Sequence, residues 1–185
     1  RPAGDLLPDE MLAEGHFDAV ARGEGELTLA EILQRGDWRG VAGVSWRDGA
    51  AIRHEPDRPL IADLDTIGMP QRDLLPDRSR YRMGKYRVEG IESSRGCPYM
   101  CSFCSIRNFH RGKWRPKGVG RVMREVEDIL QRYPEPKVIY FADDNFSTDI
   151  RRVEAICKAI VERKTDAYFW CQARADQLAK HPEVV

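Results

Sequence analysis

The stretch Val138-Ile139-Tyr140-Phe141-Ala142 is short and fully apolar, and Asp143-Asp144-Asn145 follows it at once. A run of this length that is apolar at every position is typical of a strand buried on both faces of a parallel sheet. The three polar residues mark the point where the chain leaves that strand. The stretch therefore predicts an inner strand with a polar loop at its carboxyl end.

The segments on both sides of this strand have the periodicity of helices. Before the strand, a helix is predicted over about residues 118–132 by the apolar stripe Val119, Val122, Met123, Val126, Ile129 and Leu130. After the strand, Asp149 can cap a second helix. The apolar stripe of that second helix is Val153, Ile156, Cys157, Ile160 and Val161.

Two further strands are predicted at 86–92 and 168–171, which gives the order strand, helix, strand, helix, strand. This order implies a parallel α/β sheet. Ligands of such sheets and barrels bind at the carboxyl ends of the strands, so we expect the loops 97–104, 143–145 and 172–176 on one edge. Because three strands do not close a barrel, the sequence predicts only part of one.

Three of the five cysteines lie in the loop after the first predicted strand, at Cys97, Cys101 and Cys104. A loop this short can direct all three sulfur atoms at one metal centre. A structural zinc site uses four protein ligands, and an iron–sulfur cube normally takes four cysteines. Three cysteines therefore leave one position for a cofactor or substrate. Cys157 and Cys171 lie far away and are expected to be buried, apolar-like residues.

The first half of the chain has a different pattern. Residues 16–35 predict a strand and then a helix ended by Gly36, and 41–54 predict a hairpin with an Asp48-Gly49 turn. The segment 55–80 is rich in proline and charge, so we place a domain boundary there. The turn 22–26 has two interpretations: its backbone amides face a ligand, or its acids favour the start of the helix.

One local run of basic residues follows the cysteine loop, with His110 and Trp114 among them: Arg107, Arg111, Lys113, Arg115 and Lys117. One interpretation is a patch for a phosphate or carboxylate of a substrate, a corrinoid tail or RNA. The other is a solvated loop.

The composition excludes several classes of protein. The chain has 185 residues, 42% of them hydrophobic, and its 30 basic residues balance its 30 acidic ones, so its charge indicates neither nucleic-acid nor membrane binding. No apolar run has the length of a membrane span, and the first residues lack the apolar core of a signal peptide. Cysteines that are bunched rather than spread do not suit a disulfide framework, so a reducing cytoplasm is expected.

The cysteine spacing, with Phe103 just before Cys104 and a strand just before the loop, resembles the radical S-adenosylmethionine superfamily. The resemblance implies a (β/α) TIM-type barrel whose three cysteines ligate three irons of a 4Fe–4S cluster, with S-adenosylmethionine on the fourth. It also implies reductive cleavage to a 5′-deoxyadenosyl radical, with electrons from a donor such as flavodoxin or ferredoxin.

The segments 20–26, 72–76 and 141–146 are similar to the class of this superfamily that carries a Rossmann-like cobalamin domain before the barrel. That class usually has an Asp-x-His-x-x-Gly motif for the lower cobalamin ligand, and this motif is absent from these residues. Either the motif lies upstream of Arg1 or the protein does not bind cobalamin.

The resemblance implies three domain segments. Residues 1–40 are the remnant of the Rossmann-like domain, 41–85 a hairpin and Pro-rich linker, and 86–185 the amino-terminal half of the barrel.

The resemblance also implies residues that bind S-adenosylmethionine, whereas no catalytic residue is assigned. Asp143, and next Asn145, are expected at the methionine ammonium group; the alternative is that the acids cap the second helix. Arg174 can pair with the methionine carboxylate and Gln172 can hydrogen-bond it; the alternative for Arg174 is a surface salt bridge. Phe103 is expected to contact adenine through its backbone, or else to pack in the core.

The expected function is cobalamin-dependent methyl transfer, or related radical chemistry, on a small molecule. One alternative is an RNA-modifying methylthiotransferase, although it requires a second cluster and an RNA-binding module, and neither is visible. Another alternative is a zinc-binding interaction module in which His110 is the fourth ligand beside the three cysteines. Iron with sulfide favours the cluster, whereas zinc favours the module.

Overall fold

The computed structural model describes residues 8–75, 77, 80–135 and 137–184, which form two compact units. The first unit holds the described residues up to Ala62 together with Tyr99–Gly112, and the second holds Asp63–Pro98 and those from Lys113 onward. The division at residues 40 and 85 that the sequence suggested stays a prediction.

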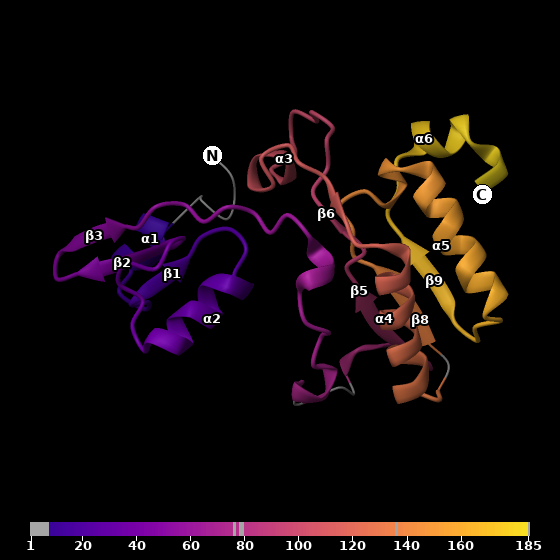
Figure 1. Cartoon of the computed structure of the whole chain (residues 1–185), viewed down its shortest axis with the longest axis horizontal. Coiled ribbons are helices and arrows are strands. Elements are labelled where there is room, and N and C mark those ends of the chain that lie inside the picture. Colours follow the sequence, from indigo (N-terminus) through magenta and orange to yellow (C-terminus); the bar gives the residue numbers. More distant parts are fainter. Residues whose placement is uncertain (1–7, 76, 78–79, 136, 185) are drawn as a thin grey trace. The chain divides into compact units, whose positions relative to one another are not determined.

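The second unit is built on a four-stranded sheet with the order β4-β5-β8-β9 (Figure 1). Its strands are β4 (Arg82–Met83), β5 (Tyr86–Ile91), β8 (Lys137–Phe141) and β9 (Tyr168–Cys171). β5, β8 and β9 are parallel, as predicted, and β4 pairs antiparallel with β5. Sequence analysis missed β4, because two residues are too few to show a period.

The two predicted helices of this unit are α4 (Val119–Arg132) and α5 (Ile150–Glu162), and both pack on one side of the sheet (Figure 1). The core between them and the strands contains Ile91, Val122, Val126, Ile129, Ile139, Phe141, Val153 and Ile156. The predicted cap of α5 is confirmed, since the Asp149 carboxylate accepts a hydrogen bond from the backbone N–H of Arg152 at 3.2 Å.

The expected burial of Cys157 is wrong. Successive helix residues are rotated by about 100°, so a helix with Ile156 fully buried turns Cys157 toward the edge of the contact, and Cys157 is exposed. Cys171, on β9, is partly buried. The buried position that the stripe did not predict is Arg152, one turn before Ile156.

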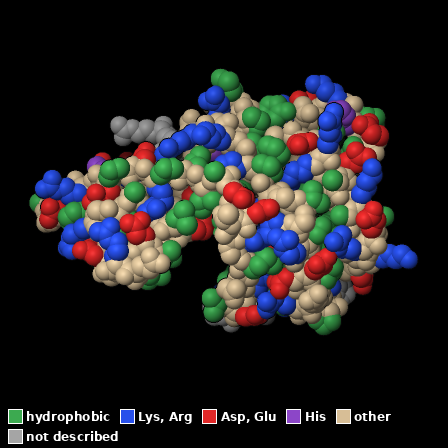
Figure 2. Space-filling model, in the orientation of Figure 1, with side chains coloured by type: hydrophobic (Ala, Val, Ile, Leu, Met, Phe, Trp, Pro, Cys, Tyr) green, Lys and Arg blue, Asp and Glu red, His purple; other side chains and the backbone are tan. Residues whose placement is uncertain are grey.

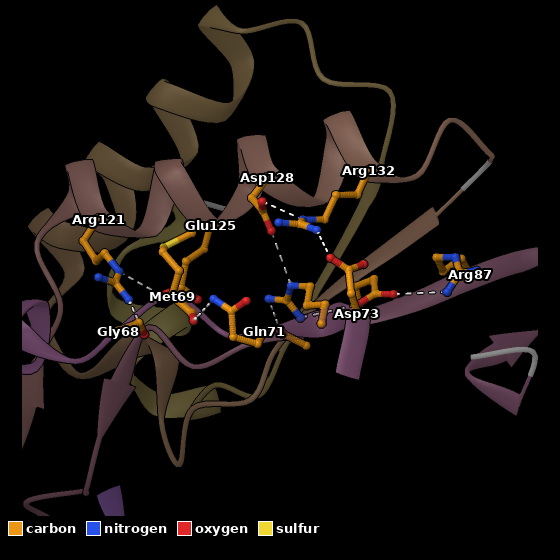
Figure 3. A network of polar contacts seen from close by, with 12 residues as sticks. Gly68, Met69, Gln71, Asp73, Arg87, Arg121, Glu125, Asp128 and Arg132 are labelled. Atoms are coloured by element: carbon orange, nitrogen blue, oxygen red, sulfur yellow. Dashed lines mark hydrogen bonds and ion pairs between the residues drawn. The ribbon is translucent and has the colours of Figure 1, made fainter. Parts of the chain in front are cut away.

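The Pro-rich segment that begins the second unit is tied to α4 by arginine side chains (Figure 3). It contains the short 3₁₀ turns η2 (Leu64–Thr66) and η3 (Arg72–Leu74). Arg121 on α4 donates to the carbonyl of Gly68 at 3.0 Å, and Arg132 pairs with Asp73. The segment 63–75 is therefore fixed against the helix that covers the sheet.

The first unit contains a three-stranded antiparallel sheet with the order β1-β2-β3. Its strands are β1 (Ala19–Ala21), β2 (Val44–Asp48) and β3 (Ala51–His54), and its helices are α1 (Pro8–Ala13), α2 (Glu26–Arg35) and the short α3 (Ile106–Phe109). The predicted hairpin is confirmed. α2 ends at Gly36, whose left-handed backbone (φ 67°) lets its N–H bond to the carbonyl of Ile32.

The surface carries basic and acidic side chains side by side over both units (Figure 2), which agrees with the balanced charge of the chain. Among the helices that the structure describes, none has both the length and the apolar character needed to cross a bilayer.

Candidate cofactor site

The loop that carries the three cysteines is closed at its base. After β5 ends, β6 (Ser94–Arg95) pairs antiparallel with β7 (Arg115–Pro116), so the chain leaves and returns at one place. The backbone N–H of Lys117 donates to the carbonyl of Ser93 at 2.9 Å and extends this pairing by one bond. The residues between the two short strands therefore form a loop anchored beside the carboxyl end of β5.

The two acids after β8 hold the start of this loop. Asp143 is 2% exposed; its Oδ1 accepts from the N–H of Ser93 at 2.6 Å, and its Oδ2 accepts from the hydroxyls of Ser93 and Ser94 at 2.7 and 2.6 Å. Asp144 accepts from the N–H of Gly96 at 2.9 Å. These acids do not cap α5, and both carboxylate oxygens of Asp143 accept hydrogen bonds from the chain itself.

Arg152 joins the two sides of the loop base. Its Nη2 donates to the carbonyls of Ser93 at 2.7 Å and Lys117 at 3.1 Å, and its Nη1 donates to the Ser93 hydroxyl at 3.3 Å. Burial lowers the pKa of Arg152, and the carboxylate of Asp143 opposes that shift. Sequence analysis missed Arg152, because an arginine among the charged residues of a helix is normally exposed. It also missed both serines.

Glycine is required immediately before the first cysteine, since Gly96 has a left-handed backbone with φ 85°. Further along, the N–H of Cys104 donates to the carbonyl of Cys101 at 3.1 Å and forms a tight turn. All three cysteines are free thiols and partly buried. Among the residues described, no three or more His, Cys, Asp or Glu side chains are already arranged around one metal ion.

The chemistry of this donor set fits an iron–sulfur cluster. Three thiols within eight residues are soft ligands of the kind that iron–sulfur clusters take, and the loop around them holds no disulfide. The assignment of Cys97, Cys101 and Cys104 as ligands stays a prediction. The zinc alternative required His110, which is buried with its ring against that of Phe109.

The loops after β8 and β9 lie together, as the parallel sheet predicted. The N–H of Phe146 donates to the carbonyl of Gln172 at 2.9 Å, and the N–H of Arg174 donates to the hydroxyl of Ser147 at 3.0 Å. The same hydroxyl donates to the Asn145 Oδ1 at 2.9 Å. Asn145, Gln172 and Arg174 are thereby gathered on one edge of the sheet.

These three residues differ in exposure. Asn145 is 2% exposed, and its amide nitrogen donates to the hydroxyl of Thr148 at 2.9 Å. Gln172 is exposed, and the Nε of Arg174 donates to Asp176 at 2.9 Å. Phe103, in the cysteine loop of the first unit, is 91% exposed and so does not pack in a core. Their predicted roles toward S-adenosylmethionine stay predictions.

The basic run divides between the two units. Lys117 is 5% exposed and its Nζ lies 2.8 Å from the Glu125 carboxylate, which Arg121 also contacts at 3.0 Å. Arg115 is also buried, whereas Arg111 is exposed and pairs with Asp57 at 3.3 Å. The run is neither one ligand patch nor one solvated loop, because its last members belong to the interior.

The turn 22–26 is held by contacts within the first unit. The carboxylate of Glu24 accepts from the N–H of Ile61 at 2.6 Å, and Arg22 pairs with Asp57 at 2.6 Å. Gly23 has a left-handed backbone with φ 73°. The glutamate therefore fastens the turn to the chain that leaves the small sheet.

A hollow of about 440 Å³ lies on the second unit, lined by Met83, Tyr86, Val138, Tyr168, Phe169 and Trp170. Tyr86 and Tyr168 begin their strands, so the hollow is at the amino ends of the sheet. It is separate from the edge at the carboxyl ends of the strands, where the loops after β8 and β9 lie together.

Comparison with known proteins gives several relatives, although no family model matches the chain. An uncharacterized methyltransferase of Pyrococcus horikoshii is 36% identical over 86% of this chain and 35% of its own length. The hopanoid C-3 methylase of Methylococcus capsulatus is 33% identical over 98% of this chain and 34% of its own. An anaerobic magnesium-protoporphyrin IX monomethyl ester cyclase of Synechocystis is 28% identical over 96% of this chain and 36% of its own length.

The fold is similar to that of a solved radical S-adenosylmethionine methyltransferase, TsrM of Kitasatospora setae. Its structure with tryptophan and an S-adenosylmethionine analogue matches 85% of this chain and 31% of the TsrM chain. The TM-score is 0.64 and the sequence identity is 19%. A second structure of that protein contains cobalamin and a 4Fe–4S cluster. The fold class predicted from the sequence is confirmed. The present chain spans about a third of the length of the relatives it matches.

Proposed function

We propose that this chain, which belongs to the radical S-adenosylmethionine superfamily, supplies the cofactor-binding part of an active site that performs methyl transfer or related radical chemistry. The observation behind the proposal is the cysteine loop itself: three free thiols spaced 97, 101 and 104, on a loop closed at the carboxyl end of β5. Relatives named as methyltransferases and as a methylase favour methyl transfer.

The thiolates of Cys97, Cys101 and Cys104 would hold three irons of a 4Fe–4S cluster. When bound, the cluster and S-adenosylmethionine supply reductive cleavage to a 5′-deoxyadenosyl radical. The protein's part is to present the three sulfurs together and leave the fourth iron accessible. The left-handed backbone of Gly96 redirects the chain just before Cys97, the first proposed ligand. The turn between Cys101 and Cys104 brings the backbones of the other two together.

S-adenosylmethionine would lie along the edge formed by the loops after β8 and β9. Arg174 can direct guanidinium nitrogens at a carboxylate, and the exposed Gln172 beside it can donate its amide. Asn145 braces this edge through Ser147 and Thr148. The proposed contact of Phe103 with adenine rests on the family resemblance alone. Asp143 is not assigned to the ammonium group, because both of its oxygens already accept hydrogen bonds.

The substrate is proposed to be a small molecule, in line with tryptophan in the solved relative. Cobalamin is proposed as a further cofactor, and flavodoxin or ferredoxin as an electron donor, in a cytoplasmic setting. The cobalamin proposal is supported by the second structure of that relative and by the similarity to a cyclase and a methylase over nearly the whole chain.

The test is anaerobic reconstitution of the chain with iron and sulfide, followed by metal analysis and EPR of the reduced protein. We expect about four irons per chain and an EPR signal that S-adenosylmethionine alters. One equivalent of zinc without sulfide would support the zinc module instead. Absence of iron and of the EPR signal would overturn the proposed function.

A further inference from the structure

The base of the cysteine loop contains two buried groups of opposite charge, Asp143 and Arg152. We call Ser93, Lys117, Asp143 and Arg152 the loop clamp. Its four members come from the end of β5, the end of β7, the loop after β8 and the first turn of α5. Three chain segments that are distant in sequence therefore meet at the two ends of one loop.

The polar groups of the loop clamp satisfy one another. The Ser93 hydroxyl donates to Asp143 at 2.7 Å and lies 3.3 Å from the Arg152 Nη1, so it bridges the two charges. The Ser93 carbonyl accepts from both the Lys117 N–H and the Arg152 Nη2. A buried charge without its partner is strongly unfavourable, so loss of either ion destabilises this arrangement.

Arg152 has a geometry that lysine cannot copy. Its planar guanidinium reaches the carbonyls of Ser93 and Lys117 at once, from two nitrogens, and so spans the outgoing and returning chain. A lysine ammonium is a single nitrogen, so it cannot replace the bonds of Nε and Nη1 as well as those of Nη2. The Lys117 side chain does not replace it, because its Nζ is paired with Glu125.

The loop clamp is separate from the apolar core. None of its members is among the core residues that pack α4 and α5 on the sheet. Opening of the loop clamp would therefore leave the contacts of the apolar core in place. Ser93 is only four positions before Cys97, and the Asp144 bond to Gly96 continues the same restraint up to the cysteine.

We propose that Arg152 and Asp143 are positioning residues for the cluster: by closing the base of the cysteine loop they fix the backbone that presents Cys97, without touching the cluster. This inference rests on the proposed function, and it names the residues that hold the cysteine loop in the conformation needed to bind the cluster. A loop free to open at its base would lose its cysteines from the cluster one at a time.

The experiment compares the wild-type chain with Arg152→Met, Arg152→Lys and the control Arg151→Met. Arg151 is the neighbouring arginine on the same helix, and it is exposed. Hydrogen exchange of the amides of Ser93, Gly96 and Lys117 is measured without metal. Separately, iron release to a chelator and the EPR signal with S-adenosylmethionine are measured after reconstitution. Far-UV circular dichroism reports whether each variant keeps the fold.

We expect Arg152→Met to exchange at these three amides roughly tenfold faster, and to release iron roughly tenfold faster, than wild type. Arg152→Lys should give rates of amide exchange and iron release between those of Arg152→Met and wild type. Arg151→Met should match wild type in both rates. Unchanged exchange in Arg152→Met overturns the clamp. Faster exchange with unchanged iron release and EPR signal shows a structural role only and overturns the positioning proposal. A wild-type chain that binds no iron overturns the proposed function instead, and the exchange result, which needs no metal, tells the two failures apart.

Discussion

Asp143 and Ser93 are 50 residues apart in sequence, yet the Asp143 carboxylate accepts from both the backbone N–H and the hydroxyl of Ser93. The contact fastens the end of β5 to the loop after β8, its parallel neighbour in the sheet. Because Ser93 also begins the segment that leads into the cysteines, this contact joins the sheet to the start of the proposed cluster loop.

Replacing Asp143 with alanine should destabilise the second unit by about 3 kcal/mol, since it removes the main counter-charge of the buried Arg152 and leaves three donors unpaired. Asp143→Asn should cost less, because the amide oxygen can still accept one of those bonds. Chemical denaturation of both variants measures the difference. Equal stability of Asp143→Ala and wild type would contradict the arrangement described here.

Each of the variants Cys97→Ser, Cys101→Ser and Cys104→Ser should lose iron binding, because a cluster with only two protein ligands does not survive reconstitution. The iron content should fall from about four per chain to nearly none. Matched controls are Cys157→Ser and Cys171→Ser, which should keep the full iron content. Iron and sulfide analysis after desalting measures this. Equal loss in the controls would point to oxidation damage rather than ligation.

Glu125 is 1% exposed and receives both Lys117 and Arg121, so it balances two buried cations. Glu125→Ala should lower the free energy of unfolding by about 3 kcal/mol, because both cations then lose their partner. Lys117→Met should cost less, since Arg121 still pairs with the carboxylate. Urea titrations of the two variants give the comparison, and a reversed order would show that Lys117 dominates the pair.

Glu55 makes the stability of the first unit depend on pH. The backbone N–H of Gly40 donates to it at 2.8 Å and the Trp46 indole at 3.1 Å, and these bonds hold the pKa of Glu55 below its ordinary value. A carboxyl with a lowered pKa stabilises the fold above its unfolded-state pKa, and the effect is lost as pH falls through the folded-state value.

Glu55→Gln should therefore melt at a lower temperature than wild type near neutral pH, and the two melting temperatures should converge in acid. Thermal unfolding followed from about pH 7 down to about pH 3 tests this. A gap that persists unchanged in acid would show that the ionised form of Glu55 contributes nothing.

The sequence predicted the elements of the second unit well, because their signals are local. The apolar run before Asp143 and the stripes of the two helices each arise from consecutive residues, and the Asp149 cap depends on one side chain next to its own helix. The prediction failed where burial depends on a distant partner. Arg152, Lys117 and Glu125 are charged residues, and only contact with one another and with distant backbone makes their burial favourable.

The sequence by itself determined the order of strands and helices, the three-cysteine loop and the family to which they point, because periodicity and short spacing are written along the chain. Only the tertiary structure decided that Asp143 accepts hydrogen bonds from Ser93 and Ser94, and that Arg152 joins the two ends of the cysteine loop. The physical reason is that a buried charge takes its partners from whatever the fold brings beside it, and here those partners lie in segments far apart in the sequence.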